Sequence, residues 1–334
     1  MVNGKSFPSI HHLLFSIHLS LLFTIYDLRF TRLVTVFMIR LLALDMDGTL
    51  LDSRGQLSER NRRAISLARE RGVEVALVTG RRFRDARPLA LELALDAPLI
   101  SHNGALTKHA RTLETVEALL LPLDAAREVL RVGREHGGDA LVSDDPQGAG
   151  VLVYDHLSDN NTALARYIAW ARRIHGDEVK DAVRRVECLE EYMDHPPVHI
   201  AFSGGCEAMR SLGCVIEGEL GNSVKMLATM YPKQDFALLD IIHPAASKGE
   251  GVAAAARELN IEREEVMAIG DNLNDLEMLR YAGTSVIMGN SEPTLRDLLR
   301  DAARFHTTAT NDEDGVAMAI EEFILRKSPG DFGF

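Results

Sequence analysis

The chain has 334 residues, of which 46% are hydrophobic and 26% charged. This is a globular composition, long enough for about two domains and unlike that of disordered or low-complexity proteins. The formal net charge is −12 and no block of Lys and Arg stands out, so nucleic acid is not expected as a partner. Three cysteines, Cys188, Cys206 and Cys214, are too few and too widely spaced for a disulfide framework or a paired-CxxC zinc site. A reduced, cytoplasmic setting fits best.

Residues 1–37 differ from the rest of the chain. They hold only four charged side chains, and the apolar run at residues 13–25 is shorter than the roughly 20 residues that span a bilayer. The stretch also lacks the basic start and small-residue cleavage site of a secretory signal. We therefore expect the functional protein to begin at Met38. Residues 1–37 are then an N-terminal extension that is disordered or a misassigned start, and no stable membrane association is expected.

After residue 39, short apolar runs alternate with amphipathic segments. Ser58 is a suitable N-cap for a helix that ends before Gly72, between the first two runs. A strand–helix–strand order of this kind is typical of a parallel sheet. The expected strands are residues 41–44, 73–78 and 99–100, which end at Asp45, Thr79 and Ser101.

The middle of the chain, residues 122–242, has a different pattern, in which strands follow one another with helices packed on one side. This order predicts an α+β unit. The charge-rich segment 177–191 gives no assignment. The expected helices are residues 123–135, 161–173 and 207–220, and the expected strands are 141–143, 151–154, 198–202, 224–230 and 236–242.

The strand and helix alternation returns at the end of the chain. We therefore expect a doubly wound parallel α/β core split into residues 38–121 and 243–334, with residues 122–242 inserted as a cap domain. The expected elements are helices at residues 251–259, 275–281 and 316–325 and strands at 266–269 and 286–288.

Polar residues follow several of the strands in the split core. Ligands of open parallel sheets bind beyond the carboxyl ends of the strands, so these side chains are expected to converge. An all-oxygen set of carboxylates and amides suits Mg²⁺. The residues are Asp45, Asp47, Thr79, Asn103, Asp271, Asn272, Asn274 and Asp275.

The segment Asp45-Met46-Asp47-Gly48-Thr49 is the sharpest of these elements. Residues i and i+2 leaving a strand point to the same side, while Met46 points back to the core. One carboxylate can then attack while the other handles a proton. Taken alone, the segment is more often a strand end followed by an ordinary Asp-Gly turn.

Three further elements are each weak evidence for a phosphate-binding site when taken alone. Thr79 and Gly80 offer a hydroxyl and a backbone N–H of the kind that phosphate oxygens need. Lys248 precedes a helix start and can neutralise a phosphoryl group, although a surface lysine is the default interpretation. Residues 270–275, Gly-Asp-Asn-Leu-Asn-Asp, open a helix and could be plain N-capping by Asp271. All four elements occurring together by chance, in this order, is improbable.

In this order the elements resemble the haloacid dehalogenase (HAD) superfamily of phosphohydrolases. DMDGT at residues 45–49 resembles its first motif, Thr79 its second, Lys248 its third and GDNLND at residues 270–275 its fourth. The insertion between the second and third motifs resembles the Cof-type subfamily with its α/β, C2-type cap. The likeness runs from about residue 38 to 325, and further matching segments are ISHNGA (100–105), MGNSEP (288–293) and NDEDGVAMAI (311–320).

The resemblance implies roles for individual residues. Asp45 would be the nucleophile that becomes an aspartyl phosphate, and Asp47 the general acid and base. The Asp45 side chain, the Asp47 carbonyl and the Asp271 side chain would hold Mg²⁺. The phosphoryl oxygens would be bound by Thr79, Gly80, Lys248 and Asn274, with Asp275 orienting Lys248 or the waters of the metal.

The implied reaction is hydrolysis of a small phosphorylated metabolite, such as a sugar phosphate or a related cofactor phosphate. A phosphomutase of the phosphomannomutase type shares the second aspartate and stays an alternative, as does a non-catalytic sensor of phosphorylated metabolites.

Specificity is expected to come from the cap, which would open and close over the core. The pair His195 and His199 has superficial metal-ligand spacing, but the two prolines between them argue against it. The cap candidates are Asp144, Asp145, His199 and Lys225.

Overall fold

The structure is a computed structural model that describes residues 38–159, 161–174, 182–300 and 305–326. The chain divides into two units, Met1–Met38 and Ile39–Phe334. The extension expected over residues 1–37 lies outside the described residues. Within those described ranges, no helix has the length and apolar character needed to cross a membrane.

Eight strands form the first sheet, and most of them are parallel. Their bounds are β1 (Leu41–Asp45), β2 (Glu74–Val78), β3 (Leu99–Ser101), β4 (Leu106–Lys108), β5 (Thr115–Ala118), β12 (Val266–Gly270), β13 (Thr284–Ile287) and β14 (Phe305–Thr307). The strand order is β14-β13-β12-β1-β2-β3-β4-β5, with β4 and β5 antiparallel to their neighbours. β1 pairs in parallel with β2 and with β12, so the two distant parts of the chain meet at its sides.

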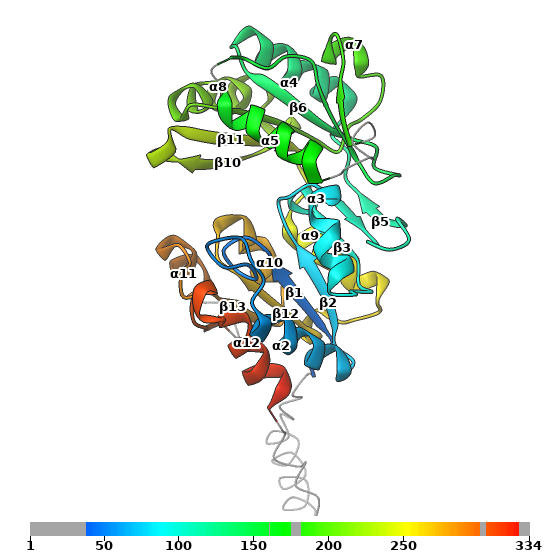
Figure 1. The fold of residues 1–334 in the computed structure, drawn as a ribbon, viewed down its shortest axis with the longest axis vertical. Coiled ribbons are helices and arrows are strands. Elements are labelled where there is room, and N and C mark those ends of the chain that lie inside the picture. The colour runs from blue at the N-terminus through cyan, green and yellow to red at the C-terminus, as the bar shows by residue number, and fades with distance from the viewer. Residues whose placement is uncertain (1–37, 160, 175–181, 301–304, 327–334) are drawn as a thin grey trace, which may run out of the picture. The chain divides into compact units, whose positions relative to one another are not determined.

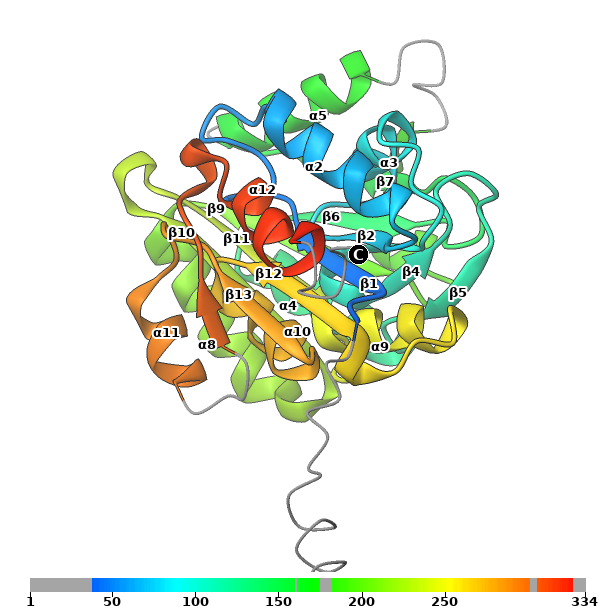
Figure 2. The ribbon, with the colours of Figure 1, turned by 90° about the horizontal axis from the view of Figure 1, so that it is seen from below.

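Helices cover both faces of this sheet, as Figure 2 shows. Along β1, Leu42 and Leu44 pack with α2, α3 and α12, whereas Leu41 and Ala43 pack with α9, α10 and α11. Because side chains alternate along a strand, the continuous apolar run fills two cores at once. The doubly wound α/β fold predicted from the sequence is confirmed. The helices are α2 (Glu59–Glu70), α3 (Phe83–Glu92), α9 (Lys248–Glu258), α10 (Leu276–Tyr281), α11 (Pro293–Leu299) and α12 (Gly315–Ile320).

The predicted ends of α2 are confirmed. The Ser58 hydroxyl accepts the Asn61 N–H, and Gly72 follows the last turn with a φ of +80°. A side-chain acceptor at the N-cap satisfies a backbone N–H that has no partner within the helix, and glycine adopts the left-handed conformation at low cost. Local sequence signals therefore set both ends of this helix.

The second sheet is built from the chain between β5 and β12 (Figure 1). Its strands are β6 (Asp139–Asp144), β7 (Val151–Tyr154), β8 (Val183–Arg185), β9 (His199–Gly204), β10 (Lys225–Tyr231) and β11 (Phe236–Ile242). Its helices are α4 (Leu123–Glu135), α5 (Thr162–Ile174), α7 (Leu189–Tyr192) and α8 (Cys206–Leu220). The strand order is β10-β11-β9-β6-β7-β8. We keep residues 122–242 as the proposed bounds of the cap.

The expectation that the cap helices share one side of their sheet is wrong. α4 and α8 pack on one face with Val142 and Phe202, but α5 packs on the other face with Leu141 and Ala201. Adjacent residues of a strand point to opposite faces, and both members of each adjacent pair are apolar. The sheet therefore needs helices on both sides, at least over β6 and β9.

Several contacts join the cap to the core. The fully buried Lys108 ammonium donates to the carbonyls of Pro146 (2.7 Å) and Gly148 (2.6 Å) in the loop between β6 and β7. Arg84 donates to the Gly150 carbonyl (2.6 Å) of the same loop. Three hydrogen bonds to backbone carbonyls fix this loop against the core, independently of the two chain crossings between the regions.

Candidate active site

The predicted aspartate pair leaves β1 as expected. Asp45 is the last residue of β1 and only 4% exposed, and Met46 is fully buried in the core. The Asp47 side chain is 57% exposed and accepts hydrogen bonds from Arg81, with 2.7 Å from Arg81 Nε to Oδ2. Gly48 has a φ of +82°, and a Cβ there would lie 2.5 Å from an Asp271 oxygen. The turn therefore needs glycine both for its conformation and for the approach of Asp271.

Lys248 lies in contact with two buried carboxylates. Its ammonium is 2.6 Å from Asp45 Oδ1 and 2.5 Å from Asp275 Oδ1, and all three side chains are at most 5% exposed. Lys248 is the first residue of α9, capped by Ser247, so the helix begins earlier than the residue 251 predicted from the sequence. Burial lowers the pKa of Lys248, but Asp275 and Asp45 raise it more, so the ammonium stays charged.

Three aspartates gather around this lysine. Oxygen atoms of Asp45, Asp271 and Asp275 all lie within 4.8 Å of one another. Burial, followed by the charge of Asp275, raises the pKa of Asp45 well above its usual value and that of Asp271 to about 6. A divalent cation would favour the charged form of both groups, and the donors are all oxygen. The site therefore fits Mg²⁺ in charge and in donor type.

Hydrogen bonds orient the acidic groups. The Thr49 hydroxyl donates to Asp271 Oδ1 at 2.7 Å. Asp275 Oδ2 accepts the backbone N–H groups of Asp271 (2.9 Å) and Asn272 (3.0 Å). Asn272, and not Asp271, is the N-cap of the following turn, with Asp275 completing a capping box. Asp271 is thereby left free of the capping role that was the alternative interpretation of this motif.

The residues expected to bind phosphate also meet at this edge of the sheet. Thr79 follows β2 and is 1% exposed, and a Cβ on Gly80 would lie 3.1 Å from the Asn103 amide. Asn274 donates to Asn103 Oδ1 at 3.0 Å, and its own Oδ1 is buried with no partner among the described residues. A buried polar atom without a partner is costly, which points to a ligand that completes the site.

Arg81 and Thr49 are site residues that were not predicted from the sequence. Arg81 stands directly after Thr79 and Gly80, so its place in the motif was the available signal. What it contacts depends on the conformation of its side chain, which no local pattern specifies. In the structure it carries the positive charge that faces Asp47.

The four cap candidates lie in different surroundings. Asp144 is buried against Tyr192 and His195, and Asp145 turns the loop with a φ of +61°. His199 lies 2.8 Å from Asp240, and its ring is 5.7 Å from that of His102 in the core. His195 and His199 thus have separate partners, and the low weight given to them as a metal pair agrees with this arrangement. The Lys225 ammonium is 2.8 Å from Glu277 of α10.

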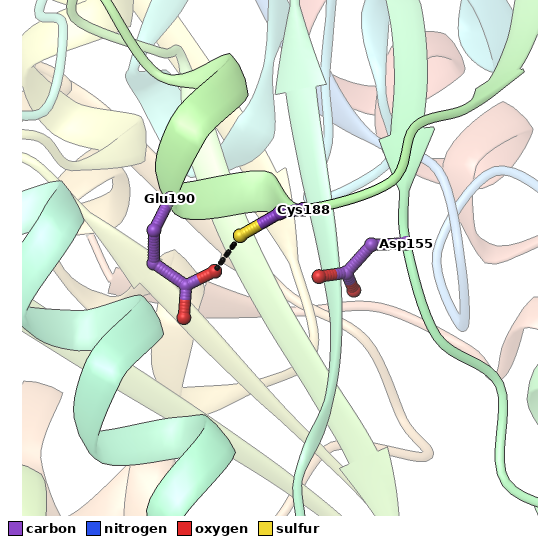
Figure 3. A group of neighbouring side chains, drawn as sticks. All are labelled: Asp155, Cys188 and Glu190. Atoms are coloured by element: carbon purple, nitrogen blue, oxygen red, sulfur yellow. Dashed lines mark hydrogen bonds between the residues drawn. The ribbon is translucent and has the colours of Figure 1, made fainter.

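A second group of possible metal ligands lies in the cap. Figure 3 shows Asp155, Cys188 and Glu190, with the thiol 3.3 Å from a Glu190 oxygen. The Arg134 guanidinium is 2.5 Å from both Asp155 and Glu190. Both carboxylates of this cluster are thus ion-paired with Arg134, and we assign the cluster no part in the proposed reaction.

Comparisons with known proteins identify the family. A model of the haloacid dehalogenase-like hydrolases matches residues 42–320. The chain belongs to this family. The prediction from the sequence motifs that the chain is a Cof-type HAD phosphohydrolase is thereby confirmed. The predicted enzyme class, a phosphoric monoester hydrolase, is confirmed as well.

Individual relatives match this HAD hydrolase over most of its length. The putative phosphatase YxeH of Bacillus subtilis (strain 168) is 31% identical over 293 residues, covering 87% of this chain and all of its own. Pyridoxal phosphate phosphatase YbhA of Escherichia coli (strain K12) is 30% identical, covering 86% and 99%. The crystal structure of a haloacid dehalogenase-like hydrolase from Bacteroides thetaiotaomicron superimposes with a TM-score of 0.70 at 25% identity, covering 85% and 98%.

Proposed function

We propose that this chain is a Mg²⁺-dependent phosphatase that hydrolyses small phosphorylated metabolites through an aspartyl phosphate. The observation that carries the proposal is the buried Asp45 carboxylate at the end of β1, in contact with Lys248 and beside Asp271. Relatives named as phosphatases of pyridoxal phosphate and of 5-amino-6-(5-phospho-D-ribitylamino)uracil support the substrate class. Sugar phosphates or related cofactor phosphates stay within this prediction.

In the proposed mechanism Asp45 attacks phosphorus and displaces the alcohol, forming the aspartyl phosphate. Asp47 protonates the leaving oxygen and then takes a proton from the water that hydrolyses the intermediate. Mg²⁺, held by Asp45, Asp271 and the Asp47 carbonyl, would neutralise the charge between the anionic ester and the carboxylate. Lys248 places a fixed positive charge beside the attacking oxygen.

The other proposed contacts position the phosphoryl group. Thr79, the Gly80 N–H and Asn274 bind the oxygens over which charge spreads in the transition state. Arg81 holds Asp47 in this structure. For Asp47 to act as general acid and base, its ion pair with Arg81 must open. The phosphoryl anion of the substrate is an alternative partner for the Arg81 guanidinium.

The test is hydrolysis of p-nitrophenyl phosphate with Mg²⁺ and with EDTA. We expect activity that EDTA removes and Mg²⁺ restores, and that Asp45→Asn abolishes. Asp159→Asn, at an exposed aspartate, is the matched control and should keep full activity. Activity that persists in Asp45→Asn would reject the mechanism. Transfer of phosphate between positions of a hexose phosphate, without free phosphate, would favour the phosphomutase, and binding without turnover would favour the sensor.

A further inference from the structure

One face of the cap sheet points toward the catalytic edge of the core. In an antiparallel pair, residues directly opposite each other share a face. β10 and β11 pair Leu227 with Asp240, Thr229 with Leu238 and Tyr231 with Phe236. We call these six residues the cap strip. Asp240 also pairs with Ala201 of β9, which belongs to the face that α5 covers further along the sheet.

The cap strip is not covered by α5. The apolar cluster under α5 draws on β6, β7, β8 and β9, and none of the six strip residues belongs to it. Tyr231 is 44% exposed, and the other five side chains are partly exposed. On the opposite face of the same strands, Leu239 and Ile241 are fully buried against α8. The strip is therefore a half-open surface of an otherwise packed sheet.

Contacts at one end of the strip, and an electrostatic interaction at the other, relate it to the catalytic edge. At one end, Lys225 of β10 is 2.8 Å from Glu277, two residues after Asp275. Leu227 packs against the core cluster that contains Met46, the residue between the two aspartates of the first motif. At the other end, burial and then the nearby charge of Asp47 raise the pKa of Tyr231. The strip thus begins beside the helix that follows the fourth motif and ends where the charge of Asp47 is felt.

The chemistry of the strip is mostly apolar with a single acid. The Tyr231 and Phe236 rings stack at 5.9 Å and 25°, the Thr229–Leu238 pair comes next, and Leu227 lies opposite Asp240 at the other end. Asp240 Oδ1 bonds His199, and no partner of its other oxygen is recorded among the described residues. The strip contains no Lys or Arg. Polyhydroxy alcohols would lose the water around several hydroxyls against leucine and phenylalanine, and would find in return only the Asp240 carboxylate and the Thr229 and Tyr231 hydroxyls.

We infer that the cap strip binds the leaving group of the substrate and selects a flat, aromatic alcohol that carries one hydrogen-bond donor for Asp240. The inference rests on the proposed function, because it assigns the part of the ester that lies beyond the phosphoryl group. Tyr231 and Phe236 supply flat surfaces for the ring, Leu227 and Leu238 exclude water from it, and Asp240 accepts from the donor. His199 orients Asp240.

The test compares three esters: 4-(hydroxymethyl)benzyl phosphate, 4-methylbenzyl phosphate and glycerol 3-phosphate. We expect kcat/KM to be at least about tenfold higher for either benzyl ester than for glycerol 3-phosphate. The hydroxymethyl ester should exceed the methyl ester by about tenfold, as a hydrogen bond to a charged acceptor allows. Equal kcat/KM for all three esters would overturn the inference.

Two variants assign the preferences to residues. Leu238→Asn should lower kcat/KM for the benzyl esters about tenfold relative to glycerol 3-phosphate, and Leu238→Met should restore it. Asp240→Asn keeps an acceptor for His199 but should reduce the preference for the hydroxymethyl ester. Ala228→Ser, at an exposed position on the other face of β10, is the matched control. A general loss of folding changes all esters alike, so the ratios separate recognition from stability.

The outcomes distinguish the two proposals. If no ester is hydrolysed, or if hydrolysis survives Asp45→Asn, the proposed function fails and the inference falls with it. If hydrolysis depends on Asp45 but the ratios among the esters are the same in Leu238→Asn, in Asp240→Asn and in the unmodified protein, the assignment of the strip alone is overturned.

Discussion

Replacing Lys248 by methionine tests the electrostatics of the site most directly. The change removes the ammonium that lies 2.6 Å from Asp45 and 2.5 Å from Asp275 and leaves both carboxylates buried. Methionine fills a similar volume without charge. In EDTA the variant therefore holds an uncompensated pair of buried anions.

The size of the effect follows from two bounds. With oxygens within 4.8 Å of one another, two carboxylates repel by about 3.5 kcal/mol at an effective dielectric constant of ~20. Uptake of one proton limits the loss, because protonating a carboxyl whose usual pKa is 3.8 costs about 4.4 kcal/mol at pH 7 and about 1.6 kcal/mol at pH 5. We expect Lys248→Met to lose about 3–4 kcal/mol at pH 7 and at most about 2 kcal/mol at pH 5.

The pH dependence has a definite sign. In the variant the folded-state pKa of the carboxyl lies above its unfolded value, so the folded state binds the proton more tightly. The stability of the variant is then greatest at low pH and is lost as the pH rises through the folded-state pKa. Mg²⁺ binds the folded carboxylates and should restore part of the loss.

The assay is urea unfolding followed by far-UV circular dichroism, at pH 7 and pH 5, with EDTA or Mg²⁺. Lys233→Met, at an exposed lysine of the cap, is the control and should change stability by less than about 0.5 kcal/mol. We also expect kcat to fall about 10²- to 10³-fold in Lys248→Met. A loss in EDTA below about 1 kcal/mol at pH 7, or one equal at both pH values, would refute the reasoning.

Three further changes have expected outcomes. His102 is buried, and burial followed by the charge of His199 lowers its pKa well below 6.5, so the folded state excludes the proton and loses stability as the pH falls below 6.5. In urea unfolding, His102→Asn should remove about 1.4 kcal/mol of the stability that the unmodified protein loses between pH 7.5 and 5.5. An unchanged pH dependence in the variant would contradict this prediction. Gly104→Ala places a Cβ 1.8 Å from the Ser247 carbonyl at a φ of +91°. Gly72→Ala is the comparison, because Gly72 has a similar φ of +80° but a Cβ there would meet open space, and it should lose about 1–2 kcal/mol of unfolding free energy. In thermal unfolding, Gly104→Ala should lose more than twice as much stability as Gly72→Ala. Equal losses for the two variants would argue against the clash. Asp271, with a pKa of about 6, must release its proton to bind Mg²⁺. Calorimetry should therefore give an affinity for Mg²⁺ that is about tenfold weaker at pH 5 than at pH 8. An affinity independent of pH would count against the place of Asp271 in the metal site.

Local signals predicted much of the fold. α4 and β11 have the bounds expected from the sequence, because an amphipathic period marks the helix and an apolar run interrupted only by Asp240 marks the strand. β4 and β5 were not predicted, because they are short and carry polar residues, two of which are buried in β4. Lys108 in β4 is buried since its ammonium reaches two carbonyls 38 and 40 residues away. Such a partner is not visible in a local pattern.

The candidate site was predictable for a different reason. Its residues follow parallel strands, and the topology alone brings the ends of β1, β2 and β12 to one edge. The pairing of Arg81 with Asp47 and the composition of the cap strip were not predictable. The first depends on a side-chain conformation, and the second depends on the register of β10 against β11, in which a shift of one residue exchanges the two faces.

The position of β1 between β2 and β12 has a consequence for synthesis of the chain on the ribosome. β2 follows β1 within the first part of the core, but β12 is translated about 220 residues after β1, a delay of roughly 10–40 s at typical rates. During that time one edge of β1, which has four apolar residues before Asp45, lacks the partner it has in the folded protein. The cap between β1 and β12 can already be complete. An emerging chain of this protein therefore carries an unpaired, aggregation-prone edge on the strand that ends in Asp45 until β12 has been made.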